Sequence, residues 1–112
     1  MKTHLLLLAQ YNIWATARLA ENLRKVSQED FHKNVGLFFE SIMGTLNHLL
    51  LGEHYLWFSR FDQGISPQMS LSTQLHSDQM LLLDELEQKS RNWMTFLDAL
   101  DESRLAGDLT YN

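Results

Sequence analysis

Apolar residues recur at three- and four-residue steps along three long stretches of this chain, which is the period of an amphipathic α-helix rather than of a β-strand. Thr3 is a suitable cap for a first helix that reaches about Val26. Its expected apolar stripe consists of Leu5, Leu8, Ala15, Leu19, Leu23 and Val26. The pattern therefore predicts an all-α fold.

The second and third helices differ in how much of their surface is apolar. Ser41 is a suitable N-cap for a second helix reaching about Phe61. Apolar residues surround most of this helix, as is typical of a helix at the centre of a domain or at a subunit interface. The third helix is expected to begin at Ser70 or Ser72 and to end near Leu100.

Charged pairs mark the outer face of the third helix. Glu85 precedes Lys89 by four residues, and Glu87 precedes Arg91 by the same interval. An acid placed four residues before a base stabilises an exposed helix by a few tenths of a kcal/mol. We expect this face to be solvated and to have no functional role.

The connections complete the predicted architecture. Residues 27–36 are polar with room for one helical turn, and residues 101–112 form a short extended piece. Three amphipathic helices in one chain indicate a bundle, and a fourth helix would cover their stripes better. We expect that another chain supplies this cover or that the sequence stops before the fourth helix.

Composition narrows the class of protein. The 112 residues are 45% hydrophobic and 21% charged, which suits a single folded domain. The net charge of −5, with no basic run longer than Arg24-Lys25, argues against nucleic-acid binding. The chain has no cysteine, and its apolar runs are too short for a signal peptide or a membrane span. We expect a cytoplasmic protein.

His48 is the strongest candidate for chemistry among the five histidines. Gly44 and Gly52 lie four residues to either side of it, and Thr45 and Tyr55 share its helix surface. Two glycines inside a helix cost about 1 kcal/mol each, so something must approach closely at this face. Spacing alone favours a core histidine bonded to a neighbour, with a metal ligand as the alternative.

Other polar residues give weaker signals. Tyr11 and Asn12 cluster on the first helix and could line a site, although Asn12 is more simply a buried polar group with a partner. His54, among apolar neighbours, is expected to be a satisfied interface histidine. Three further histidines are expected to be surface residues: His4, His32 and His76.

Three segments carry a resemblance to a known family. They are residues 11–15 with Arg18-Leu19, residues 38–50, and residues 57–61. The most specific part is the run Ser41-Ile42-Met43-Gly44-Thr45-Leu46-Asn47-His48-Leu49-Leu50. These segments resemble the DinB family, and the resemblance extends from the first helix to the end of the chain, a single domain over residues 1–112.

The resemblance implies a four-helix bundle of up-down-down-up type, usually dimeric, with a divalent metal such as zinc or nickel held by three histidines. His48 matches the first ligand, and the other two belong to a His-x-x-x-His pair on the fourth helix. Because Tyr111-Asn112 matches the start of the last connection, we expect this chain to hold only the first three long helices and an incomplete metal site.

The resemblance also implies an activity. Family members with known chemistry are metal-dependent transferases of small thiols or hydrolases, and the family name suggests induction by stress or damage. The competing hypothesis is a metal-free helical protein for dimerisation or small-ligand binding, with contacts lined by Tyr11, Trp14, Leu50 and Trp57. A third possibility is that two chains cover each other and complete a metal site across their interface.

Overall fold

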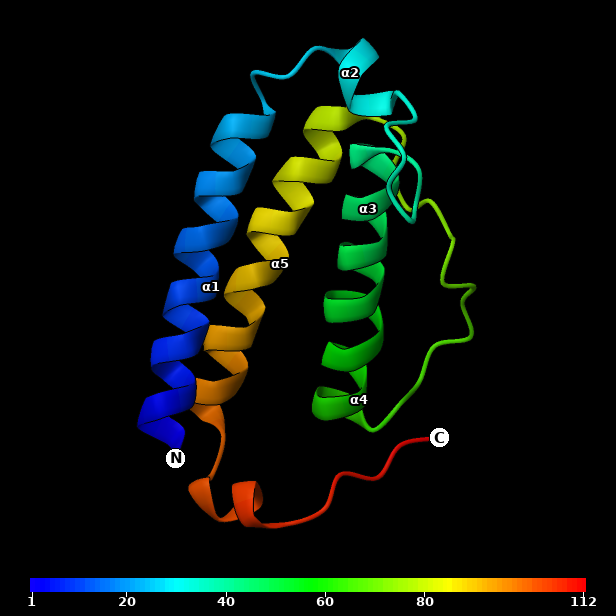
Figure 1. Cartoon of the computed structure of the whole chain (residues 1–112). Coiled ribbons are helices and arrows are strands. Elements are labelled where there is room, and N and C mark those ends of the chain that lie inside the picture. Colours follow the sequence, from blue (N-terminus) through cyan, green and yellow to red (C-terminus); the bar gives the residue numbers. More distant parts are fainter.

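Three long helical rods form the molecule in the computed structural model, which describes residues 1–112 (Figure 1). The first rod runs up in Figure 1, and the second and third both run down. No strand is present, so the expected all-α bundle is confirmed, with its first three helices in up-down-down order. The rods are α1 (Lys2–Leu23), the continuous run of α3 (Ile42–Leu49), η1 (Leu50–Trp57) and α4 (Phe58–Gln63), and α5 (Gln79–Ala99).

The predicted start of the second helix is confirmed. The side-chain oxygen of Ser41 accepts a hydrogen bond from the amide of Gly44 at 2.9 Å, which caps α3. Ser27 caps the short helix α2 (Gln28–His32) by accepting from the amide of Asp30 at 3.1 Å. This is the single turn expected in the first connection.

The predicted start of the third helix is wrong. α5 begins at Gln79, where Asp78 caps it by accepting from the amide of Leu81 at 2.9 Å. The bundle direction explains the difference: α4 ends at the lower end of Figure 1, α5 starts at the upper end, and residues 64–78 must travel back along the molecule. The hydroxyl of Ser70 is instead 3.0 Å from that of Ser72, within this connection.

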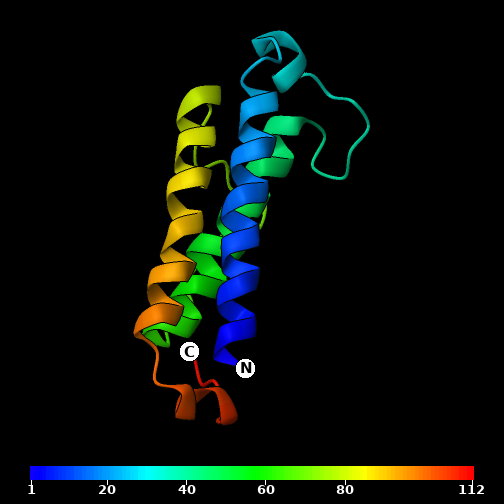
Figure 2. The same ribbon diagram turned by 90° about the vertical axis from the view of Figure 1, so that its left-hand side faces the viewer.

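The expected stripe of the first helix is only partly buried: Leu23 and Val26 pack against the core. Leu8 and Leu19 are exposed, whereas Ala9 and Ala20 are buried. Small side chains let α1 lie close to α5, and both views show these two helices side by side (Figures 1 and 2). The helix also starts at Lys2, after Met1, with no cap from Thr3. None of the helices combines the length and apolarity needed to cross a bilayer.

Two apolar layers fill the bundle. In the upper layer Phe31 of α2 is fully buried against residues such as Leu50, Leu82 and Leu86. In the lower layer four aromatic rings pack edge to face, with centroids 5.0 to 6.3 Å apart. They are Phe58, Phe61, Trp93 and Phe96.

The residues after α5 cross beneath the bundle (Figure 1). A short 3₁₀ helix, η2 (Glu102–Ala106), leads into an extended piece. Its end is held by the amide of Asn112, which donates to the carbonyl of Gly64 at 3.3 Å. The Tyr111 ring lies 4.5 Å from the guanidinium of Arg60. The segment thus has partners that sequence alone did not reveal.

Candidate functional site

Two contacts hold the His48 ring in one orientation. It stacks on the Phe39 ring, with centroids 4.0 Å apart and planes 20° from parallel. Its Nδ1 lies 3.2 Å from the carbonyl oxygen of Leu71. Because a carbonyl can only accept, Nδ1 carries the proton of this bond, and in the neutral ring Nε2 keeps its lone pair. A histidine prepared in this way can act as a metal ligand or a base.

The two residues that hold the His48 ring, Phe39 and Leu71, line a cavity of about 270 Å³, and His48 itself is not part of the lining. Gly44 lies at its wall, where a Cβ would be only 2.1 Å from the carbonyl oxygen of Phe39. The close approach expected at Gly44 is therefore made by the connection before α3. A Cβ on Gly52 would meet nothing within 4 Å. The cavity is lined by Phe38, Phe39, Glu40, Gly44, Asn47, Leu71, Ser72, Thr73 and Gln74.

Asn47 of α3 binds the long connection between α4 and α5, residues 64–78, through side-chain hydrogen bonds. Its Oδ1 accepts from the amides of Leu75 at 2.8 Å and His76 at 3.0 Å. Its Nδ2 donates to the carbonyls of Met43 at 3.0 Å and His76 at 2.9 Å. Sequence reasoning missed this residue, although an amide on the apolar stripe between Met43 and Leu50 was a usable signal.

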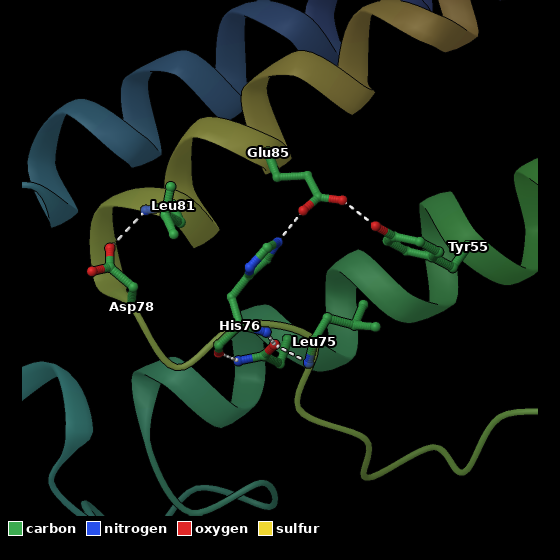
Figure 3. Close-up of polar contacts among 7 residues, drawn as sticks. Tyr55, Leu75, His76, Asp78, Leu81 and Glu85 are labelled. Atoms are coloured by element: carbon green, nitrogen blue, oxygen red, sulfur yellow. Dashed lines mark hydrogen bonds and ion pairs between the residues drawn. The ribbon is translucent and has the colours of Figure 1, made fainter.

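A polar cluster joins η1, the long connection and α5 (Figure 3). The Tyr55 hydroxyl donates to one oxygen of Glu85, and Nε2 of His76 donates to the other. Burial raises the pKa of Glu85, but these two hydrogen bonds outweigh it and hold the pKa below its usual value. Burial, together with Glu85, raises the pKa of Tyr55 to about 12. The cluster thus pairs a carboxylate with a phenol that stays protonated.

This cluster corrects two expectations from the sequence. Glu85 does not belong to a solvated face with Lys89, because it is largely buried in contact with Tyr55. His76 is a bonded partner of Glu85 rather than a free surface residue. The second expected pair is also absent, since Glu87 contacts Arg24 of α1 at 2.8 Å. Both glutamates therefore pair with residues of other elements and not with a base on their own helix.

A second polar contact crosses from α1 to η1. Asn12 donates to Glu53 at 2.9 Å, as expected for a polar residue with a partner. Burial raises the pKa of Glu53, and this hydrogen bond only partly offsets the rise. The neighbouring His54 is buried, and desolvation lowers its pKa to about 4. Nδ1 of His54 has no hydrogen-bond partner and Nε2 lies 3.8 Å from Glu53, too far for a hydrogen bond, so the expectation of a satisfied histidine is wrong.

The candidate residues do not all meet in one place. Gly44 lines the cavity, whereas His48 is connected to it only through its contacts with Phe39 and Leu71. Thr45 turns its hydroxyl back to the carbonyl of Ser41 at 2.9 Å. Tyr11 is exposed on α1, where its ring lies 5.7 Å from that of Trp14. The others occupy the separate polar contacts already described, Tyr55 with Glu85 and Asn12 with Glu53.

The side chains of this chain could supply only part of the three-histidine metal site that the resemblance implies. No group of three His, Cys, Asp or Glu side chains lies close enough together to hold a metal ion. His48 offers one free nitrogen but belongs to no such group. The residues of this chain therefore do not form a three-histidine site by themselves.

Among the comparisons with known proteins, only the comparison with protein families gives a match. Residues 1–107 match the model of the DinB family. No curated protein and no solved structure matches the chain. The match includes all three long rods and His48.

Proposed function

The chain belongs to the DinB family, and from this premise we propose that it binds a divalent metal, zinc or nickel, with His48 as one ligand. The observation that carries the proposal is the fixed imidazole ring. The Leu71 carbonyl engages Nδ1 and leaves Nε2 available, which is the arrangement that metal-ligating histidines usually have. By resemblance, the associated activity is metal-dependent transfer of a small thiol or hydrolysis.

The remaining ligands must come from beyond the three rods, because one imidazole binds such metals weakly. We propose that a further protein surface packs on the face that carries His48. Two features support this. Gly52, one turn after His48, has open space where a Cβ would stand, and the adjacent Leu49 is exposed. A second copy of the chain could contribute another histidine at this face.

Metal titration tests the proposal. Zn²⁺ and Ni²⁺ are titrated calorimetrically into the chain, the His48→Ala variant and the His4→Ala variant, and the mass of the assembly is measured alongside. His4 is a matched control because it is an exposed histidine with no side-chain hydrogen bond. We expect binding that is lost in His48→Ala and kept in His4→Ala. Absent binding, or equal binding by all three proteins, would contradict the assignment.

One observation favours the alternative of a metal-free dimerisation protein. Leu7, Tyr11 and Trp14 form an exposed apolar stripe on α1, with 61%, 63% and 57% of their surface accessible. Such a stripe suits a homodimer contact. Leu50 cannot share in it, because it is fully buried in the core. Dimerisation without any metal binding would favour this second function.

A further inference from the structure

A larger cavity, of about 490 Å³, lies at the lower end of the bundle, away from His48. Its volume falls within the range of about 300 to 1,000 Å³ that is usual for small-molecule sites. Its walls come from three helices and from the C-terminal segment that crosses beneath them (Figure 1). The lining includes Leu5, Phe61, Trp93, Phe96, Leu105 and Leu109. The cavity is independent of the proposed metal ligand.

Most of the lining is apolar, and the charged side chains of Arg104 and Asp108 interrupt it. The indole N–H of Trp93 is buried and has no acceptor. An unpaired buried donor of this kind is uncommon, because losing water without gaining a partner costs about 1 to 3 kcal/mol. Because the indole nitrogen has almost no accessible surface, it offers no polar contact to a ligand in the cavity.

Arg104 supplies a positive charge at the same cavity. No carboxylate lies within ion-pair distance of its guanidinium, although Asp108 also lines the cavity. A guanidinium without a partner suits an oxyanion, because it presents several N–H donors in one plane. Asp108 would repel an anion and so limits the number of negative charges that the cavity can take.

We propose that this cavity binds a small amphipathic monocarboxylate, with its hydrocarbon part among the aromatic rings and its carboxylate toward Arg104. The C-terminal segment that forms one wall is fixed by contacts within the chain. Arg60 lies between the rings of Trp57 and Tyr111, 4.5 Å from each centroid, and this contact anchors the end of the segment. Binding therefore requires little ordering of the chain.

Titration with decanoate, at concentrations below micelle formation, tests the proposal. We expect Arg104→Gln to weaken binding by about two- to fivefold, as for a partly exposed ion pair. Leu97→Trp, which fills the cavity, should weaken binding by at least about tenfold. Decanol should bind to the chain and to Arg104→Gln equally, because it carries no charge.

Matched controls separate the cavity from other surfaces. Leu19→Trp places the same bulk on an exposed position of α1 and should leave binding unchanged. Circular dichroism establishes that each variant keeps its helices, and Arg104 is exposed, so its variant should fold. No decanoate binding, unchanged binding by Leu97→Trp, or an equal effect of Arg104→Gln on decanol would overturn the proposal. None of these outcomes depends on metal binding at His48.

Discussion

Asn47 shows how one side chain can hold a connection that has no regular structure of its own. It is nearly fully buried, and its amide uses all four hydrogen bonds described above. We expect Asn47→Ala to lower the free energy of unfolding by about 3 kcal/mol, because buried backbone groups lose their partners. Urea denaturation measures this change.

Asn22 gives a matched control for that substitution. Its exposed side chain makes a single bond, to the carbonyl of Arg18 at 2.9 Å. Asn22→Ala should change stability by less than about 0.5 kcal/mol. Similar losses in the two variants would mean that the contacts of Asn47 with the long connection do not form in solution.

His54 makes the stability of the protein depend on pH. Its pKa is about 4 in the fold, against an ordinary value of 6.5, so the unfolded chain takes up the proton first as the pH falls. The stability contributed by the neutral ring is complete above pH 6.5, decreases as the pH falls toward 4 and changes no further below that. The loss is at most about 3 kcal/mol.

Replacing His54 should flatten this dependence. We expect His54→Gln to have a smaller slope of unfolding free energy against pH between 6.5 and 4 than the parent chain. Glu85, whose pKa is lowered, loses its contribution at still lower pH, below its ordinary value of 4.5. Denaturant titrations at several pH values measure the slope. An unchanged slope in the variant, or the same flattening in His4→Gln, would rule out His54 as the source.

At the scale of elements, the two glycines of the second rod provide a direct comparison. Gly44→Ala should destabilise the chain by about 1 to 3 kcal/mol, because the Phe39 carbonyl would have to move away from the new Cβ. In the chain without the further surface proposed above, Gly52→Ala has open space and should stabilise the helix by up to about 1 kcal/mol. Thermal and urea unfolding compare the two. Equal destabilisation by both would indicate that another surface packs on Gly52.

The same elements show which features could be predicted from sequence. The cap at Ser41 is a local signal, so the predicted start of the second helix is correct. The cap at Ser27 is equally local, but the sequence pattern predicted only one helical turn in that connection and no start. The start of α5 was wrong because the length of the connection depends on the direction of the preceding rod. In η1 the amide of Phe58 donates to the carbonyl of Glu53, five residues back. This wider turn alters the helix faces in a way that four-residue spacing does not anticipate.

The candidate site was less predictable than the fold. The flanking glycines singled out His48 and the resemblance gave it a role, but its stacking and hydrogen-bond partners, Phe39 and Leu71, lie in connections without a periodic pattern. The partners of Glu85 are likewise distant in sequence, at Tyr55 and His76. Charge spacing within a helix reveals only neighbours on that helix. Such contacts follow from the packing of whole elements.

At the scale of the molecule, apolar surface is distributed unevenly. The face of α1 toward α5 is covered, whereas its opposite stripe of Leu7, Tyr11 and Trp14 meets solvent. Contiguous apolar patches on a monomer usually mark a contact with another molecule. A two-fold dimer would place this stripe against itself, since closed symmetry uses the same patch on both copies.

The dimer can be tested through this stripe. We expect light scattering to give twice the mass of the chain at micromolar concentration and a melting temperature that rises with protein concentration. Trp14→Glu should weaken the dimer by at least about tenfold while leaving the monomer folded, because it puts a charge on an exposed apolar contact. Leu81→Glu, at a similarly exposed position of α5, is the control and should stay dimeric. A monomeric parent chain would show that the predicted dimer does not form. Dissociation caused only by Leu81→Glu would show that the dimer interface lies on α5 and not on α1.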